Sequence, residues 1–229
     1  MANIRDYLHF RGDLSLLQDP FNEVDGLILS EISYIDYSGI VKEEPDRRVG
    51  FEEATEAFFD GKDQKDLSLG AILPDEILDL CKDAATAPRF SGASLTAYRN
   101  VKKEGAQDSE KMQWAVLTFI LPDDSLFIAF SGTDDSLVSW KEDLDMAVED
   151  VLPSQKLAVA YINELASAYP GKLLRIGGHS KGGNIAVYSA ANCAPSVQDR
   201  ILTVYDNDGP GFSAEFLASP GYKRIKEKV

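Results

Sequence analysis

The fold is decided by the stretch Leu173-Leu174-Arg175-Ile176-Gly177-Gly178-His179-Ser180-Lys181-Gly182-Gly183-Asn184. It opens with a short, mostly apolar run, which is typical of a buried strand. It then passes through a G-x-S-x-G pattern directly into residues 181–192, where abundant small residues predict a helix. The pattern alone arises by chance in about one chain in ten of this length, given the usual frequency of glycine. The strand before it and the helix after it are what predict a nucleophile elbow, a sharp strand-to-helix turn that presents a reactive serine.

Ser180 is the candidate nucleophile of this turn. Glycines two residues before it and two residues after it let neighbouring backbone segments approach without a clashing Cβ atom. The positive amino-terminal end of the following helix favours the oxyanion that forms when a carbonyl is attacked. Two alternatives stay open: an unreactive serine in a glycine-rich turn, and a turn that binds an anion through backbone N–H groups. A Walker phosphate loop fits poorly, because its lysine precedes the serine or threonine, whereas Lys181 follows Ser180.

An acyl-transfer site also needs donors aimed at the developing oxyanion. The backbone N–H of Lys181, the residue after the nucleophile, is expected to be one donor. The second is expected from the loop Ser131-Gly132-Thr133-Asp134, where Thr133 offers both an N–H and a hydroxyl. This loop has a second predicted role as well, because Asp134 or Asp135 can cap the helix that is expected next.

Strands and helices alternate around the elbow, which predicts an α/β fold. Strands are expected around 95–97 and over 114–121, 126–130, 173–177 and 201–205, and helices over 137–148, 154–168 and 181–192. Because strand, helix and strand alternate after Leu126, right-handed crossovers and a mainly parallel sheet flanked by helices are predicted. Ligands of such sheets bind beyond the carboxyl ends of the strands. One domain is expected over residues 1–229, with the sheet core in 91–229.

Residues 1–90 are predicted to be mostly helical. Asn22 can cap a helix whose apolar stripe runs from Val24 to Ile35 and which ends near Gly39. Pro74, at a first-turn position, opens a second helix along Ile77, Leu80 and Ala84. One role for this helical part is to cover the cleft at the elbow. The sequence pattern alone does not test that role.

Composition argues against several classes of protein. The 229 residues include 23 Lys and Arg against 38 Asp and Glu, a formal net charge of −15, which opposes binding to nucleic acid or to anionic membrane surfaces. No apolar run is long enough to span a bilayer, and the first residues lack the apolar core of a signal peptide. Cys81 and Cys193 show no CxxC spacing, which favours a reducing cytoplasm and argues against zinc. No cofactor is expected.

Histidines are scarce, which constrains any acid–base mechanism. The chain has two, His9 and His179. Adjacent residues at an elbow point to different sides, so the His179 imidazole is expected to turn toward the core while Ser180 faces the cleft. His179 is therefore predicted as a buried structural histidine and not as the catalytic base. His9 is predicted to be a surface or packing residue.

Two loops resemble those of class 3 (fungal-type) triacylglycerol lipases. Phe130-Ser131-Gly132-Thr133 looks like their F-R-G-T/S loop, and Gly178-His179-Ser180-Lys181-Gly182-Gly183 looks like their G-H-S-L-G-G elbow. A closer resemblance is to a bacterial lipase-like family catalogued as a domain of unknown function. That resemblance is carried by Arg11–Asp13 with Pro20–Asp25, Gly132–Asp135 through Trp140–Asp143, and Gly177–Asn184 with Asp208–Phe212. The resemblance implies an α/β-hydrolase fold, Ser180 as nucleophile, and Thr133 with Lys181 at the oxyanion hole. It does not supply a substrate.

The sequence departs from these lipases in two places. Ser131 stands where the loop usually carries arginine. In these hydrolases an acid and then a histidine follow the nucleophile along the chain, whereas here Ser180 is followed by the strand 201–205 and by no histidine. We therefore expect that C-terminal strands are missing, through truncation or a shortened gene, and that the edge at 201–205 is exposed as a template for oligomers. Residues 212–229 are expected to form a helix.

The segment Asp206-Asn207-Asp208-Gly209 is predicted to be a turn, with a variant catalytic acid as the alternative role. Two functions stay open for the chain. The first is a serine hydrolase of the lipase or esterase type, which acts on an ester or related acyl substrate through an acyl-enzyme and is inactive here if the histidine is absent. The second is a non-catalytic, hydrolase-like binding or interaction module, or an inactive fragment.

Overall fold

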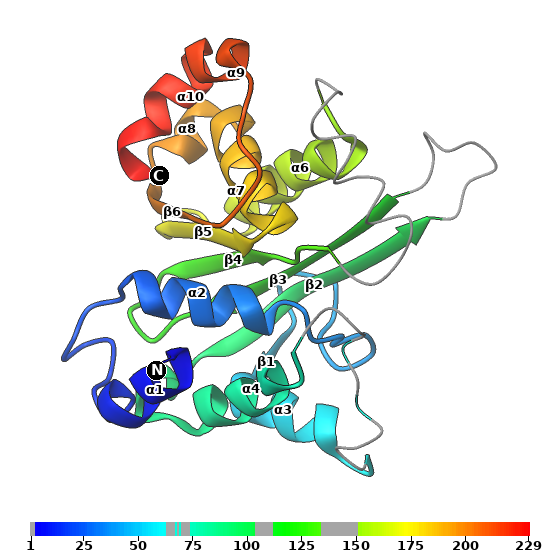
Figure 1. The fold of residues 1–229 in the computed structure, drawn as a ribbon, viewed down its shortest axis with the longest axis vertical. Coiled ribbons are helices and arrows are strands. Elements are labelled where there is room, and N and C mark those ends of the chain that lie inside the picture. The colour runs from blue at the N-terminus through cyan, green and yellow to red at the C-terminus, as the bar shows by residue number, and fades with distance from the viewer. Residues whose placement is uncertain (1–2, 63–66, 68, 70–73, 104–111, 134–150) are drawn as a thin grey trace.

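The computed structural model describes residues 3–62, 67, 69, 74–103, 112–133 and 151–229, and its centre is one six-stranded sheet (Figure 1). The strands lie in the order of the sequence: β1 (Arg48–Gly50), β2 (Ser94–Lys103), β3 (Met112–Ile120), β4 (Leu126–Phe130), β5 (Leu174–His179) and β6 (Ile201–Asn207). Strands β1 to β4 pair in antiparallel fashion, and β4, β5 and β6 pair in parallel. The molecule is therefore an α/β protein with a mixed sheet.

The expectation of a mainly parallel sheet is wrong for the first four strands. A tight turn joins β3 to β4, with the N–H of Leu121 donating to the carbonyl of Ser125 and Asp124 at a φ of 66°. A connection this short can only reverse the chain, which makes the pair antiparallel. Helix α6 (Pro153–Ala168) lies between β4 and β5 along the chain, and helix α7 (Lys181–Asn192) lies between β5 and β6. Parallel pairing is thus confined to the part of the sheet after Leu126, where the sequence alternates between strand and helix.

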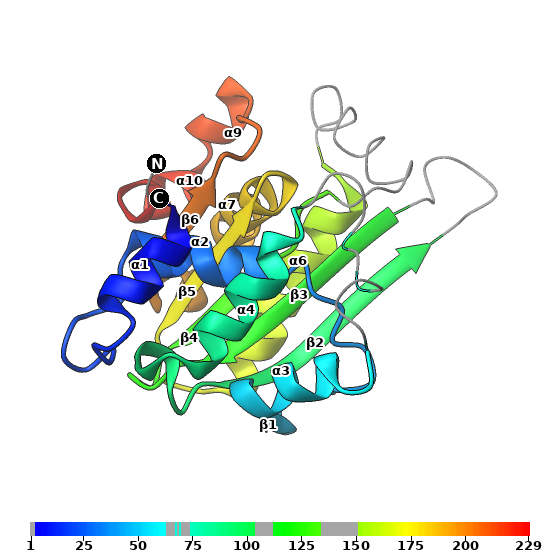
Figure 2. The ribbon, with the colours of Figure 1, turned by 60° about the horizontal axis from the view of Figure 1, so that its bottom comes forward.

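Helices cover both faces of the sheet. One face carries α1 (Ile4–Arg11), α2 (Glu23–Ile32), α3 (Phe51–Phe59) and α4 (Glu76–Thr86), and the other carries α6 and α7 (Figures 1 and 2). Strand β4 shows why its apolar run is continuous: Phe127 and Ala129 pack against the N-terminal helices, whereas Leu126, Ile128 and Phe130 pack against α6 and α7. Side chains alternate between the two faces of a strand, so a strand buried on both faces is apolar throughout.

Helix α2 begins where the sequence predicts, and the helix expected to open at Pro74 begins two residues later, at Glu76. The Asn22 side chain accepts the N–H groups of Val24 and Asp25, and the Asp25 carboxylate accepts the N–H of Asn22, which completes a capping box at the start of α2. That helix ends at Ile32 and not near Gly39. The predicted helices at 154–168 and 181–192 are confirmed as α6 and α7, whereas the helix predicted over 137–148 lies outside the described residues.

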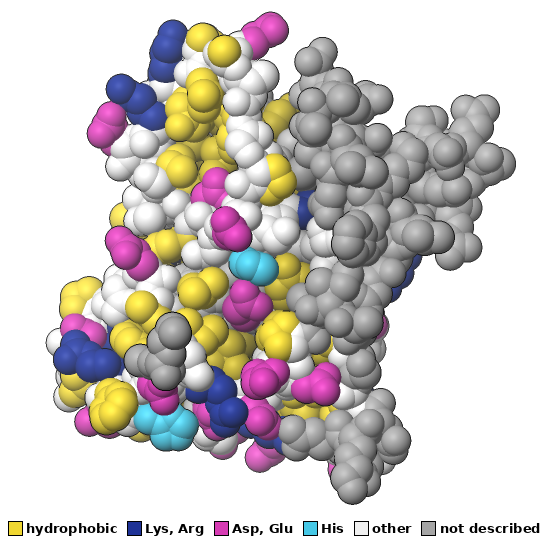
Figure 3. Space-filling model, in the orientation of Figure 1, with side chains coloured by type: hydrophobic (Ala, Val, Ile, Leu, Met, Phe, Trp, Pro, Cys, Tyr) yellow, Lys and Arg dark blue, Asp and Glu magenta, His cyan; other side chains and the backbone are white. Residues whose placement is uncertain are grey.

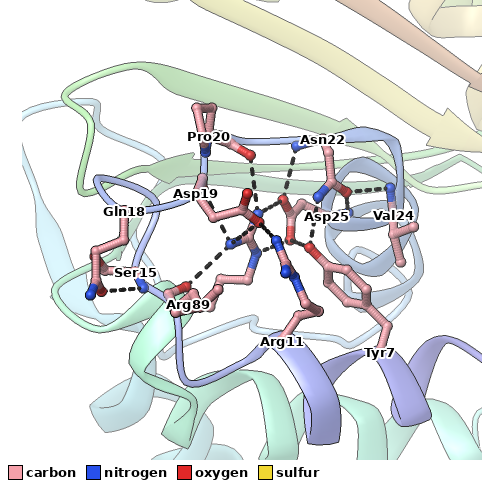
Figure 4. Close-up of polar contacts among 11 residues, drawn as sticks. Tyr7, Arg11, Ser15, Gln18, Asp19, Pro20, Asn22, Val24, Asp25 and Arg89 are labelled. Carbon is pink, nitrogen blue, oxygen red and sulfur yellow. Dashed lines mark hydrogen bonds and ion pairs between the residues drawn. The ribbon is translucent and has the colours of Figure 1, made fainter.

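A completely buried arginine fixes the position of α2 (Figure 4). Arg89, in the short 3-10 helix η2 (Pro88–Phe90), donates two hydrogen bonds of 2.5 Å to the two carboxylate oxygens of Asp25. The same guanidinium donates to the carbonyls of Leu14, Asp19 and Pro20. Asp25 is also completely buried, so the pair has no contact with water. The network therefore connects the loop before α2 and the first turn of α2 to η2, the segment between α4 and β2.

The prediction of a single helix over residues 212–229 is wrong. The segment divides into α9 (Ala214–Ala218), α10 (Pro220–Ile225) and a 3-10 turn, η4 (Lys226–Lys228). Pro220 restricts Ser219 to an extended conformation, and the Ser219 hydroxyl then caps α10 by accepting the N–H of Tyr222. Strand β6 is the last strand in the sheet order, as predicted. No helix in the described ranges has the length and apolar character to cross a membrane.

Candidate active site

Ser180 occupies the turn between β5 and α7, as the sequence predicts. Its φ of 55° and ψ of −127° are unusual for a residue with a side chain, because a positive φ brings Cβ close to the neighbouring backbone. Two hydrogen bonds hold this conformation: the N–H of Ser180 donates to the carbonyl of Asn207 at 2.9 Å, and the N–H of Gly183 donates to the carbonyl of Ser180 at 2.9 Å. The serine is thus fixed at the carboxyl end of β5 and at the amino end of α7.

The glycines around Ser180 are required by space. A Cβ atom on Gly178 would lie 2.3 Å from the carbonyl of Gly182, and one on Gly182 would lie 2.1 Å from the carbonyl oxygen of Phe130. A Cβ on Gly183 would lie 2.3 Å from Oδ1 of Asp206. At Gly178 and Gly182 the atoms in the way are backbone and cannot move aside, so these two positions need glycine, whereas at Gly183 the Asp206 carboxylate would have to turn away.

The loop after β4 brings Thr133 to the same place. Ser131 is buried, and its hydroxyl donates to the carbonyl of Ser33, just after α2. The N–H of Ser131 donates to the carbonyl of Ala115 at 3.1 Å. A serine at this position therefore anchors the loop, where the similar loop of class 3 lipases carries arginine. Thr133 is half-buried and lines the same cavity as Ser180, whereas Asp134 and Asp135 lie outside the described residues.

Lys181 is the first residue of α7. Its N–H is one of those in the first turn, which form the positive end of the helix. Its side chain turns into the protein and is completely buried. The ammonium donates to the carbonyl of Gln113 at 3.2 Å and to the side-chain oxygen of Gln113 at 3.0 Å. The Lys181 ammonium is therefore bound to Gln113 inside the protein, whereas its backbone N–H lies at the start of α7, next to Ser180.

A cavity of about 450 Å³ lies in front of Ser180. Its polar lining includes Ser180, Thr133 and His179. Its apolar wall includes Ile4 from α1 and Ile77 and Leu80 from α4. The N-terminal helices therefore form one side of the cleft.

The expected position of His179 is wrong. Its side chain is 34% exposed and borders the same cavity as Ser180, instead of being buried in the core. Its Nδ1 atom lies 3.0 Å from the hydroxyl of Tyr34 and 3.5 Å from Oε1 of Glu31. The alternation of sides that holds along a strand does not continue through the turn, because the positive φ of Ser180 redirects the chain there. His9, in contrast, is exposed on α1, as predicted.

Glu31 and Tyr34 are site residues that sequence reasoning missed. The Tyr34 hydroxyl also donates to the carbonyl of His179 at 3.4 Å, and the two rings meet edge to face at 6.1 Å. The Glu31 side chain is 14% exposed. Burial raises the pKa of its carboxyl above the ordinary value, and the nearby His179 offsets part of that rise. Nothing in the sequence connects the end of α2 with an elbow almost 150 positions later, so only the fold reveals this cluster.

The remaining polar candidates lie elsewhere. Oδ1 of Asp206 accepts the N–H of Gly209 at 3.0 Å, and Asp208 has a φ of 60°. The chain therefore bends at Asp208, whereas Asp206 and Asn207, which were expected in the turn, are the last residues of β6. Asp206 borders a different cavity, along β6. Cys81 and Cys193 are buried free thiols, and burial raises the pKa of Cys81 to about 11. Within the described ranges, no group of three or more His, Cys, Asp or Glu residues is placed to hold a metal ion.

The sequence of the chain matches one protein-family model. The model of the Mbeg1-like family matches residues 84–229, which is more than half of the chain. The chain belongs to the Mbeg1-like family. Mbeg1-like proteins are lipase-like, which agrees with the resemblance of the two loops at that level. The Mbeg1-like match includes Thr133 and Ser180, whereas the wall of the cavity formed by α1 and α4 lies before it. No curated protein and no solved structure matched the chain.

Proposed function

We propose that the chain is a serine hydrolase of the lipase or esterase type that cleaves an ester or related acyl bond through an acyl-enzyme on Ser180. The observation that carries the proposal is the conformation of Ser180, which is held at a positive φ between β5 and α7 at the edge of the cavity. A strained, well-anchored backbone conformation at a cleft is characteristic of functional residues. Membership in a lipase-like family supports the same reaction.

The chemistry follows from the groups around Ser180. The Ser180 Oγ forms a bond to the carbonyl carbon and gives up its proton, while the carbonyl oxygen gains negative charge. The N–H of Lys181, at the positive end of α7, and Thr133, which lines the same cavity as Ser180, are the proposed donors to this oxyanion. The leaving alcohol departs with a proton, and water then attacks the acyl-enzyme to release the acid and to restore Ser180.

The cavity favours an uncharged, aliphatic acyl group. Ile4, Ile77 and Leu80 line it with hydrocarbon, so burying an alkyl chain there is favourable by roughly 0.8 kcal/mol per methylene. Asp and Glu side chains are spread over the described part of the face drawn in Figure 3, and the cavity itself is lined by Glu31 and Glu76, which disfavours anionic substrates. We therefore propose a neutral ester as the substrate and no requirement for a cofactor.

The same observations support a relation to the α/β-hydrolase superfamily and, within it, to class 3 lipases. The supporting features are the parallel β4–β5–β6 unit with its helical crossovers and the elbow that follows β5. Hydrophobic clusters on both faces of one sheet favour a single domain over residues 1–229. We propose that this domain acts in the cytoplasm, in keeping with its two free thiols.

Turnover of short-chain and medium-chain nitrophenyl esters tests the proposal. Ser180→Ala should reduce kcat/KM to the small residual value that substrate binding and the oxyanion donors alone provide. Ser167→Ala, which removes an exposed hydroxyl on α6, should leave kcat/KM unchanged. Equal turnover by the two variants would contradict the role of Ser180. Binding of an ester without any turnover in the unaltered chain would favour the alternative, a hydrolase-like binding module.

A further inference from the structure

The residue that accepts the backbone N–H of Ser180 also has a side chain that reaches the other side of the elbow. Asn207 is the last residue of β6, and its carbonyl accepts the N–H of Ser180 at 2.9 Å. Its Nδ2 donates to the carbonyl of Gly178 at 3.0 Å. We propose that Asn207 is a positioning residue of this site, which holds the backbone on both sides of His179 and so keeps Ser180 in its strained conformation. The inference rests on the hydrolase function proposed above and adds the group that aims its nucleophile.

The strained backbone of Ser180 needs several contacts to hold it in place. Its φ of 55° has little support from the flanking glycines, because glycine adopts many conformations of similar energy. Asn207 supplies two of the needed contacts, which lie two residues apart along the elbow. In the register of β5 and β6, Asn207 pairs with His179, the residue between those two. One residue therefore brackets the turn.

The orientation of the Asn207 amide is determined by its partners. The carbonyl oxygen of Gly178 can only accept a hydrogen bond, so the nitrogen of the amide must face it. Nδ2 also donates to Oγ of Ser30 at 3.3 Å. The Ser30 hydroxyl gives its own proton to the carbonyl of Gly26 at 2.7 Å, which leaves its lone pairs for Asn207. Both donors of the amide are therefore used, and a carboxylate, which has none, cannot replace it.

The contact with Ser30 connects the elbow to a helix that forms part of the cavity. Ser30 is completely buried in α2, next to Glu31, which lines the cavity in front of Ser180. The helix lies so close to β5 that a Cβ atom on Gly177 would be 3.1 Å from the Ser30 hydroxyl. Asn207 therefore joins the end of β6, the elbow and α2, and it fixes the nucleophile relative to the N-terminal side of the cavity.

The neighbouring polar side chains hold other parts of the structure. Oδ1 of Asp206 accepts the N–H of Gly209, so it supports the bend after β6. The Asn184 amide donates to the carbonyl of Pro210 and accepts a hydrogen bond from Gln155, so it connects the first turn of α7 to two other segments. Within the described residues, neither side chain bonds to the backbone of residues 178–180.

Asn207 acts on the reaction through Ser180 and not through the substrate. It borders the cavity along β6, whereas the acyl group is proposed to lie in the cavity in front of Ser180. Loss of its side chain should therefore change how Ser180 is aimed and not how a ligand binds. A displacement of about 1 Å at a reacting atom is enough to lower a rate by about 10²-fold.

The labelling of Ser180 by a fluorophosphonate in the full chain tests the inference, with the maximal rate measured separately from the half-saturating concentration. Asn207→Leu keeps the backbone carbonyl and a side chain of similar size, but removes both donated hydrogen bonds. It should lower the maximal rate by about 10- to 100-fold and leave the half-saturating concentration unchanged. The matched control is Asn163→Leu, which removes the acceptor for the N–H of Ala194 just after the opposite end of α7. It should change neither quantity.

Hydrogen–deuterium exchange gives a readout that does not depend on the reaction. Asn207→Asp keeps the shape of the side chain but loses its N–H donors at neutral pH. In this variant the peptide that contains residues 177–181 should exchange faster than in the unaltered chain, because the elbow opens more often. In Asn163→Leu the same peptide should exchange at the unaltered rate. Asn207→Asp also replaces Asn207→Leu in the labelling assay if circular dichroism shows that the leucine variant is unfolded.

The outcomes separate the inference from the function on which it rests. Labelling of the Asn207 variants as fast as that of Asn163→Leu, or an elbow that exchanges no faster in Asn207→Asp, would overturn the inference and leave the hydrolase intact. A half-saturating concentration that rises while the maximal rate stays the same would also overturn it, because Asn207 would then act on binding. Absence of Ser180 labelling in the unaltered chain would contradict the hydrolase itself, and the inference with it.

Discussion

The hydroxyl of Tyr34 lies 3.0 Å from Nδ1 of His179, so the segment that follows α2 touches the residue that precedes the proposed nucleophile. The N-terminal helices are therefore part of the site as well as a cover for the sheet. The residues of these helices that line the cavity lie before residue 84, where the match to the Mbeg1-like family begins. The chemistry proposed for Ser180 thus belongs to the family region, whereas the surroundings of His179 and the cavity wall are supplied by this chain's first eighty residues.

The elbow should not tolerate a side chain at Gly182. A Cβ atom there would lie 2.1 Å from the carbonyl oxygen of Phe130, which is backbone and cannot move aside. Gly182→Ala should destabilise the protein by roughly 1–3 kcal/mol and should slow labelling of Ser180, because the turn must shift. Gly211→Ala is the control, since no atom lies within 4 Å of the added Cβ. Urea unfolding of both variants measures the difference, and equal stability would show that the elbow is not packed as described.

The buried ion pair should dominate the stability of the N-terminal helices. Arg89→Met leaves the Asp25 carboxylate buried without its partner, which costs about 3–5 kcal/mol. The control is Arg224→Met, whose partner Asp199 is largely exposed, and this substitution should cost at most about 1 kcal/mol. Urea denaturation of the two variants compares the costs. A loss for Arg89→Met no larger than that for Arg224→Met would contradict the structural role of the network.

Stability should depend on pH through Glu31. Burial raises the pKa of its carboxyl, so the folded protein holds this proton more tightly than the unfolded chain does. The stabilising effect is complete below the ordinary carboxyl pKa and is lost as pH rises through the raised one. Glu31→Gln should therefore gain stability relative to the unaltered chain as pH increases from 4 to 7. Glu52→Gln, on the exposed face of α3, should show no such trend.

Those two variants can be compared by thermal unfolding at each pH. A melting-temperature difference between Glu31→Gln and the unaltered chain that stays constant from pH 4 to pH 7 would contradict the raised pKa. So would a difference that shrinks toward neutral pH. The experiment requires no catalytic activity, so it tests the surroundings of Glu31 independently of the proposed reaction.

The apolar wall of the cavity should set the length of the acyl chain. Leu80→Trp places a larger ring in the wall and should reduce kcat/KM for longer acyl esters by at least about tenfold, while short esters keep most of their turnover. Leu217→Trp is the control, because Leu217 is exposed on α9. A series of nitrophenyl esters of increasing chain length measures the shift. An unchanged preference in Leu80→Trp would place the acyl group outside this cavity.

Much of the local structure around the elbow was predictable because it depends on neighbouring residues. The glycines around Ser180, the capping box at Asn22 and the bend at Asp208 are short-range features with a direct physical cause. The antiparallel half of the sheet was missed because the direction of a strand depends on how it is connected to the next. Strands and helices alternate only after Leu126, whereas β2, β3 and β4 follow one another without a helix between them. The position of His179 was missed because its partners, Glu31 in α2 and Tyr34 just after it, lie far away in the sequence.

The most direct test of the central claim is peptide mapping after reaction with a fluorophosphonate at neutral pH. The hydrolase proposal predicts one added phosphonyl group per chain, located on the peptide that contains Ser180, and no such modification in the Ser180→Ala variant. Modification of any other residue with Ser180 intact, or equal modification of the two proteins, would contradict it.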